Sequence, residues 1–207
     1  MPADTATNPW ILPAVVGLIS GLFSGLLGRR LEAWWFKPIL AVDFIPEEGG
    51  FRTEGSWKKD GEEYIEIYIR ARVRNSGRII AKRCRPYLVK LEEVLHSGTP
   101  STQLYDSLML RWPGQDDYEP RDIPNGVNQF FDVVGVLKNT SGWRFACEKP
   151  FPLSSTLSTY RGTYRFTVLV TGDGVIPAGR KIDVTYSGDW NNLRAVDAGP
   201  VKMSRRT

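Results

Sequence analysis

The sequence predicts a mainly β protein, an antiparallel β-sandwich preceded by one N-terminal transmembrane α-helix. Residues 9–28 form an uncharged run of membrane-spanning length. Residues 64–74 alternate strictly between apolar and polar side chains, which is the pattern of a strand with one buried face. From residue 38 onward, short strand patterns recur between Gly- and Pro-containing turns, and no helical period is present.

The predicted helix begins at Pro9, after a short N-terminal tail of residues 1–8. A run of about twenty residues crosses a hydrocarbon core of about 30 Å. An interfacial extension continues to residue 37, because Pro38 cannot continue a helix. Aromatic and basic residues mark the two interfaces of a membrane helix. This predicted membrane belt consists of Trp10, Arg29, Arg30, Trp34, Trp35 and Lys37.

The flanks of the helix favour a retained anchor over a cleaved signal peptide. A signal peptide carries positive charge before its apolar run, whereas residues 1–8 contain an aspartate and neither lysine nor arginine. Arg29 and Arg30 follow the run directly. Because cytoplasmic flanks carry the excess of positive charge, we expect a single-pass protein of the cytoplasmic (inner) membrane, with its N-terminus outside and its C-terminal domain cytoplasmic.

Small residues recur along one face of the predicted helix, and they define a candidate helix–helix interface. These residues are Gly17, Ser20, Gly21, Ser24, Gly25 and Gly28. Glycines at every fourth position let two backbones approach closely in lipid, so we expect the helix to self-associate into a homo-oligomer. The alternative is that glycine is simply frequent in membrane helices.

The β domain is expected to span residues 38–193 and to be followed by a basic C-terminal tail, 194–207. Residues 51–63 and 113–126 are polar and rich in turn residues, so the first is predicted as a loop or hairpin connection and the second as a long surface loop. A break or bulge is expected near Pro86. The predicted strands are 39–45, 64–73, 79–94, 108–112, 129–137, 142–146, 161–170 and 181–188.

Residues 71–92 resemble the two-strand core of immunoglobulin-like bacterial domains of the cell-adhesion-related (CARDB) type. Asn75, Gly77 and Ala81 carry this resemblance, and the closing segments around 162–174 and 181–190 resemble the last hairpin of such sandwiches. The whole chain is also similar to bacterial single-pass membrane proteins with one N-terminal helix before such a domain. The resemblance implies an immunoglobulin-like sandwich with a binding or scaffolding role and without catalytic residues.

Motifs for catalysis, metals or cofactors are weak in this chain. His96 is the single histidine, and it follows a predicted strand as surface residues do. The carboxylates Asp116, Asp117, Glu119 and Asp122 lack the spacing of a helix–loop–helix calcium site, which favours solvated turn residues. Cys84 and Cys147 are buried thiols in a cytoplasmic domain, or one disulfide in an exported domain. We therefore expect neither enzymatic activity nor a cofactor or metal.

The polar face of strand 64–74 is the most suggestive surface. Arginines beside tyrosines on a sheet can bind phosphates, nucleic acid or anionic lipid. The alternative is a solvated outer face whose charge is balanced by Glu66 and by acidic loops. The candidate anion-binding face comprises Tyr64, Tyr68, Arg70, Arg72 and Arg74.

These observations favour a non-enzymatic module that docks or senses proteins at the cytoplasmic membrane face. Its expected partners are the lipid bilayer, further copies of the chain and a protein not identified by the sequence. A net charge of +4 is weak support for nucleic acid as a partner. Two alternatives stay open: an envelope-facing adhesion or structural domain with Cys84 and Cys147 paired, and a binder of anionic lipid or nucleic acid using the arginine-rich face.

Overall fold

The computed structural model of the chain describes residues 36–95, 101–102, 106–114, 118–138, 143–145, 147 and 161–202. The chain divides into two units, residues 1–37 and 38–207, and the fold described below is that of the second. Within the described residues, no helix has the length and apolar character needed to cross a membrane. The run predicted to span the membrane, 9–28, lies outside the described residues.

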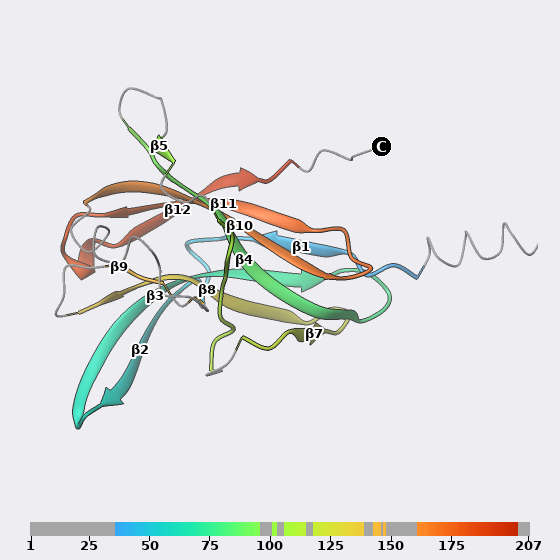
Figure 1. The fold of residues 1–207 in the computed structure, drawn as a ribbon, viewed down its shortest axis with the longest axis horizontal. Coiled ribbons are helices and arrows are strands. Elements are labelled where there is room, and N and C mark those ends of the chain that lie inside the picture. Colours follow the sequence, from blue (N-terminus) through green and yellow to red (C-terminus); the bar gives the residue numbers. More distant parts are fainter. Residues whose placement is uncertain are drawn as a thin grey trace, which may run out of the picture. The chain divides into compact units, whose positions relative to one another are not determined.

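The first of two antiparallel sheets is built around the long strand β3. β8 pairs with one edge of β3, and β1 and β2 pair with different parts of its other edge. β9 continues the sheet beyond β8. Figure 1 shows the hairpin of β2 and β3 projecting from the body of the domain. The strands are β1 Leu40–Asp43, β2 Arg52–Lys59, β3 Glu62–Asn75, β8 Asn128–Leu137 and β9 Trp143–Arg144.

The second sheet has the order β12-β11-β10-β4-β5, and β6 and β7 also pair with β4. All of its strand pairs are antiparallel, and β12 lies at one end of the order. A short 3₁₀-helix, Trp190–Asn192, connects β11 to β12. The strands are β4 Ala81–Glu93, β5 Ser101–Thr102, β6 Leu108–Met109, β7 Arg121–Ile123, β10 Gly162–Asp173, β11 Ala178–Tyr186 and β12 Arg194–Pro200.

One hydrophobic core lies between the two sheets and is rich in aromatic side chains. Trp143 of the first sheet packs against Tyr164, Phe166 and Tyr186 of the second, with ring centroids 5.7, 5.9 and 5.4 Å away. Such tilted and edge-on ring pairs add stability beyond the area that they bury. The two sheets are therefore held together through side chains that face each other, as in a sandwich.

The mainly β prediction is confirmed, and so are its clearest elements. Ile67, Ile69, Ala71 and Val73 of β3 are all buried, as the alternation predicts. Every residue from 131 to 136 in β8 is buried, so the predicted strand 129–137 is covered on both faces in its middle. β10 and β11 form the predicted closing pair.

Two of the predicted loops are wrong. Residues 52–59, predicted as connection, form β2 and pair with β3 over their whole length. A short strand, β7, lies inside the predicted surface loop 113–126. The break or bulge expected near Pro86 is present as a bulge: β4 runs through Pro86 without a break, and its register against β10 shifts on both sides of that residue. One of these shifts falls next to Arg83, whose φ of 52° is rare for a residue with a side chain.

The predicted loose tail from residue 194 is also wrong, because residues 194–200 form β12. This strand pairs with β11 from Arg194↔Thr185 to Pro200↔Arg180. Backbone hydrogen bonds to β11 supply the order that the apolar pattern of this segment does not indicate.

Candidate binding pocket between the sheet edges

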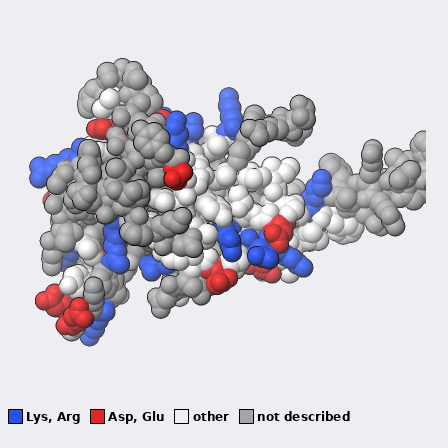
Figure 2. Space-filling view, in the orientation of Figure 1, with Lys and Arg blue, Asp and Glu red and all other residues white. Residues whose placement is uncertain are grey.

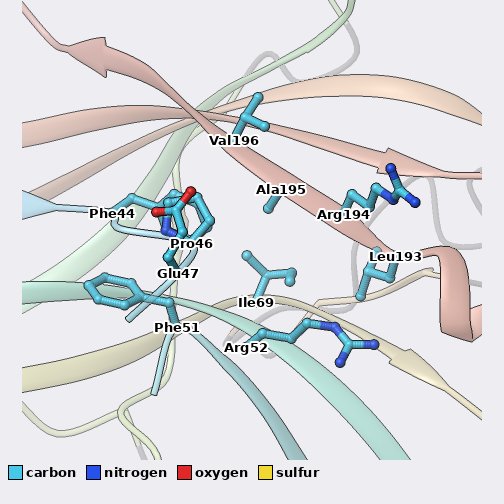
Figure 3. A pocket seen from close by; sticks show the side chains of 10 residues that line it. All are labelled: Phe44, Pro46, Glu47, Phe51, Arg52, Ile69, Leu193, Arg194, Ala195 and Val196. Atoms are coloured by element: carbon cyan, nitrogen blue, oxygen red, sulfur yellow. The ribbon is translucent and has the colours of Figure 1, made fainter. Parts of the chain in front are cut away.

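A pocket of about 300 Å³ opens between the two sheets at their edges. The loop between β1 and β2 forms one wall, β12 and the residue before it form the opposite wall, and β3 contributes to the floor (Figure 3). We call this feature the edge pocket. Its lining residues are Phe44, Pro46, Glu47, Phe51, Arg52, Ile69, Leu193, Arg194, Ala195 and Val196.

Buried apolar side chains make the floor of the edge pocket. Phe44, Phe51, Ile69 and Leu193 are each at most 3% exposed. The ring of Phe51 is packed edge-on between two other rings, with centroids 5.4 Å from Phe44 and 5.3 Å from Phe130. The floor is therefore fixed by packing on both sides, which suits a preformed site.

The loop that forms one wall turns sharply before Phe51. Gly50 has a φ of 98°, and a Cβ at this position would lie 3.0 Å from the ring of Phe130. Only glycine adopts this backbone conformation without strain. The hydroxyl of Thr53 donates to the Gly50 carbonyl at 3.2 Å, and the Arg70 amide donates to the Phe51 carbonyl at 2.8 Å. These contacts bring Phe51 to the floor.

Arg72 of β3 contacts both ends of the same loop, although it does not line the pocket. Its Nε and Nη2 donate to the two carboxylate oxygens of Asp43, at 2.8 and 3.3 Å, and its Nη1 donates to Glu48. The guanidinium carbon also lies 5.1 Å from the centroid of the Phe51 ring. Hydrogen bonding to Asp43 is the largest cause that raises the pKa of Arg72. Arg72 therefore acts as a clamp between β1, the loop and the pocket floor.

The mouth of the edge pocket carries charge. Arg52 and Arg194 are exposed, and their guanidinium groups lie on the same side of the pocket, whereas Glu47 lies on the other side (Figure 3). In the part of the chain that the structure describes, neither arginine forms an ion pair. The neighbouring Arg180 is different, because it donates two hydrogen bonds to Asp197. An apolar cavity therefore opens beside two positive charges that no described carboxylate pairs with.

The candidate anion-binding face on β3 is largely occupied by the protein's own carboxylates. Tyr68 donates to Glu66 at 2.7 Å, Tyr64 donates to Glu62 at 3.0 Å, and Arg70 donates to Asp132 at 2.8 Å. Arg72 is clamped as described, and Arg74 is exposed. A phosphate would have to displace existing charge-assisted hydrogen bonds at most of these positions. On the face shown in Figure 2, basic and acidic residues are interleaved.

Burial raises the pKa values of two groups on this face. The Asp132 side chain is 2% exposed, and desolvation raises its pKa, although the hydrogen bond from Arg70 acts in the opposite direction. Burial and the contact with Glu66 raise the pKa of Tyr68. Both groups belong to a polar network of hydrogen-bonded side chains on this face.

The remaining predicted residues are placed as follows. Lys37 is described and exposed. Cys84 is buried as a thiol and is not joined to Cys147. The helix–helix interface residues, the rest of the membrane belt and His96 lie outside the described residues. Among the described residues, no group of three or more His, Cys, Asp or Glu could hold a metal ion.

The lining of the edge pocket suits binding. It contains one carboxylate, Glu47, and lacks serine, cysteine and histidine. Sequence reasoning missed this site because its walls come from a connection and from a segment predicted as a tail. One usable signal was present: Phe44 and Phe51 flank the turn-forming segment 46–50, an arrangement that puts two aromatic rings at the base of a tight loop.

No family model matches this chain, and no curated protein shows significant similarity to it. The ligand class of the edge pocket therefore has to follow from its own geometry.

Proposed function

We propose that this chain is a non-enzymatic, membrane-anchored docking module whose immunoglobulin-like domain binds a protein at the cytoplasmic membrane face. The observation that carries the proposal is the edge pocket, in which a preformed apolar floor opens beside Arg52 and Arg194. Pockets with an apolar interior and a few polar groups at the mouth are typical binding sites. Self-association through the helix would bring several such pockets together at one membrane.

Strand order supports the immunoglobulin-like assignment. In the first sheet β1, β3 and β8 follow one another, as strands A, B and E do in an immunoglobulin domain. In the second sheet β4, β10 and β11 correspond to C, F and G. β2 and β12 are additions to this plan, and residues of both line the edge pocket.

The anchor and its orientation rest on the sequence. Residues 9–28 lack charge over a spanning length, and Arg29 and Arg30 follow them. A cysteine introduced at position 100, in a chain with Cys147→Ser, tests the orientation. In sealed cells a membrane-impermeant maleimide should label this cysteine only after the membrane is opened. Labelling in intact cells would overturn the cytoplasmic assignment.

Site-specific photo-crosslinking tests the docking role. Val196 at the pocket mouth and Ile176 in the β10–β11 loop are both exposed apolar residues, 57% and 72% exposed. We expect a benzoyl-phenylalanine at position 196 of the full chain in its native membranes to form a protein adduct that position 176 does not form. Equal adducts at both positions, or lipid adducts alone at position 196, would refute a protein-docking pocket.

A further inference from the structure

The free edge of β12 lies directly beside the edge pocket. β12 ends the second sheet, and among the described strands it pairs with β11 alone. In a terminal strand, alternate backbone N–H and C=O groups point away from the sheet and can template another strand. Leu193, Arg194, Ala195 and Val196, at the start of this edge, line the pocket.

The two halves of β12 differ in how well they resist such pairing. Toward its C-terminal end the register with β11 shifts between Lys181 and Ile182, Gly199 has a φ of 98°, and Pro200 lacks an N–H. A bulge and a proline are common devices that protect sheet edges. The N-terminal half, residues 194–196, pairs regularly with β11 and has neither device. Added pairing is therefore favoured at the half that borders the pocket.

A strand added there would place a side chain over the pocket. Successive side chains of a strand point to opposite faces, so every second residue of the added strand would face the inside of the sandwich. The opening on that side is the edge pocket, whose floor is Phe51, Ile69 and Leu193. Its volume of about 300 Å³ is at the small end of ligand sites, so it suits one large apolar side chain.

The charges at the pocket mouth favour particular charges on the residues that flank that side chain in the bound segment. Arg52 and Arg194 lie on one side of the pocket, and no described carboxylate pairs with either (Figure 3). A carboxylate on the bound segment would complement them through charge-assisted hydrogen bonds. Glu47 lies on the opposite side and disfavours a second carboxylate there.

We propose that β12 accepts an extended segment of a partner protein by β-strand addition at residues 194–196. One large apolar side chain of that segment enters the edge pocket, and an acidic residue on one flank meets Arg52 and Arg194. Main-chain hydrogen bonds supply affinity in this mode, and the pocket supplies specificity. This inference rests on the proposed docking function and specifies its ligand.

The test uses the full chain in nanodiscs of zwitterionic lipid and a phage library of random nine-residue peptides. We expect the selected peptides to share one large apolar residue with Asp or Glu on one side. The Arg52→Glu/Arg194→Glu variant should select peptides with Lys or Arg instead, because its mouth charge is reversed. Arg74→Glu makes one such charge change at an exposed site outside the pocket, and it should select the wild-type motif.

Two further measurements separate strand addition from simple pocket filling. N-methylation of alternate backbone amides in the best peptide should weaken binding at least tenfold, since it removes donors needed for pairing with β12. Replacing its apolar residue by alanine should have an effect of similar size. Thermal unfolding of each variant shows whether a loss of binding reflects loss of the fold.

The outcomes are distinct. Absence of a selected motif, a motif that the Arg52→Glu/Arg194→Glu variant shares, or indifference to N-methylation overturns strand addition. If the crosslink at position 196 persists in that case, the edge pocket still binds a protein, and only binding by strand addition is refuted. Binding of anionic phosphatidylglycerol vesicles in place of peptides, with the same dependence on Arg52 and Arg194, would show a lipid surface as the ligand and overturn the proposal.

Discussion

Arg72 lies against Phe51 with its guanidinium carbon 5.1 Å from the ring centroid, while the same guanidinium holds Asp43 and Glu48. One side chain thus connects β3 to the end of β1, to the following loop and to the pocket floor. The Arg72 side chain is 12% exposed, so its bonds to Asp43 are partly shielded from solvent, whereas the bond to Glu48 is exposed. Arg72 shapes the binding site from outside the lining.

We predict that Arg72→Ala lowers the free energy of unfolding by about 1–3 kcal/mol, because it leaves the partly buried Asp43 carboxylate without this partner and removes a cation–π contact. The substitution should also loosen the loop, so a glutamate-specific protease should cut at Glu47 or Glu48 in the variant. Urea unfolding and limited proteolysis of the full chain measure the two effects. Arg74→Ala, at an exposed site two residues away, should change stability by less than about 0.5 kcal/mol. Similar behaviour of the two variants would refute the clamp.

Gly135 is a second position at which we expect a substitution to destabilise the fold. A Cβ there would lie 2.2 Å from Glu66 Oε1 and 3.0 Å from its Cδ. Glu66 is buried, and its other oxygen accepts from Tyr68 at 2.7 Å and from Arg144 at 3.3 Å, so the carboxylate cannot swing away freely. We expect Gly135→Ala to cost about 1–3 kcal/mol, as overpacking does.

Gly49→Ala is the matched control, because a Cβ there meets nothing within 4 Å. Its effect on the urea midpoint should be close to zero. Truncation of the opposing side chain provides a further check: in a Glu66→Ala background the added cost of Gly135→Ala should shrink. An undiminished cost in that background would show that the clash with Glu66 is not the cause.

The Arg180–Asp197 pair predicts a pH dependence of known sign. Hydrogen bonding from Arg180 lowers the pKa of Asp197. A carboxyl whose folded pKa is depressed contributes stability above its unfolded pKa of about 4, and this contribution disappears as the pH falls through the folded value. Asp197→Asn should therefore cost about 0.5–1 kcal/mol at neutral pH.

The difference in the free energy of unfolding between the wild type and Asp197→Asn should vanish in acid. Urea unfolding of the wild type and of Asp197→Asn at a series of pH values between about 7 and 2.5 measures it, since both proteins are uncharged at this position below the folded pKa. A difference that is constant across this range would mean that the carboxylate charge of Asp197 is not the source of the stabilisation.

Cys84 should be an unreactive thiol in the folded protein. Burial raises its pKa to about 11, and its Sγ donates to the Ala81 carbonyl at 3.5 Å. Because the thiolate is the reactive form, a pKa raised from the usual value of about 9 to about 11 lowers the thiolate fraction about a hundredfold at pH 8. In a Cys147→Ser chain, alkylation by iodoacetamide should be at least that much slower in buffer than in urea. Comparable rates would contradict the burial of Cys84.

The parts of this fold that sequence predicts are those with a regular pattern. The alternation of β3 corresponds to the expected burial from Ile67 to Val73, and the mostly apolar segment of β8 is buried from 131 to 136. Glu66 departs from the alternation, because it is buried. β12 carries no such pattern, because it is a terminal strand whose order depends on pairing with β11. Terminal strands need little apolar content, so composition alone made residues 194–200 resemble a tail.

The candidate site shows a second feature that a single sequence does not predict, namely which charged side chains are paired. Sequence places Arg70 and Arg72 on one strand face, but their ion partners, Asp132 and Asp43, lie 62 and 29 residues away. Whether such arginines are free or paired is decided by strand neighbours, which a single sequence does not specify. The edge pocket depends in the same way on residues from a loop, from β3 and from β12. Its residues share no local pattern, and only the fold brings them together.

The glycine-rich face of the N-terminal segment gives a prediction about assembly. If the predicted helices associate through this face, replacing Gly21 and Gly25 by isoleucine would put branched side chains between them, so packing between copies should be lost. We expect the apparent dissociation constant of the full chain, measured by energy transfer between labelled copies in liposomes, to rise at least tenfold.

Leu18→Ile and Leu22→Ile, on the opposite surface of the predicted helix, conserve volume and should leave association unchanged. Protease protection in the same liposomes shows whether each variant still inserts.

Docking through several edge pockets at one membrane adds a second readout. In that case the Gly21→Ile/Gly25→Ile variant should bind a multivalent peptide more weakly, because multivalent binding depends on effective concentration. Its affinity for a single peptide should be retained. Equal energy transfer in the wild type and in this variant would instead assign the glycines to ordinary helix composition, and each pocket would then act alone.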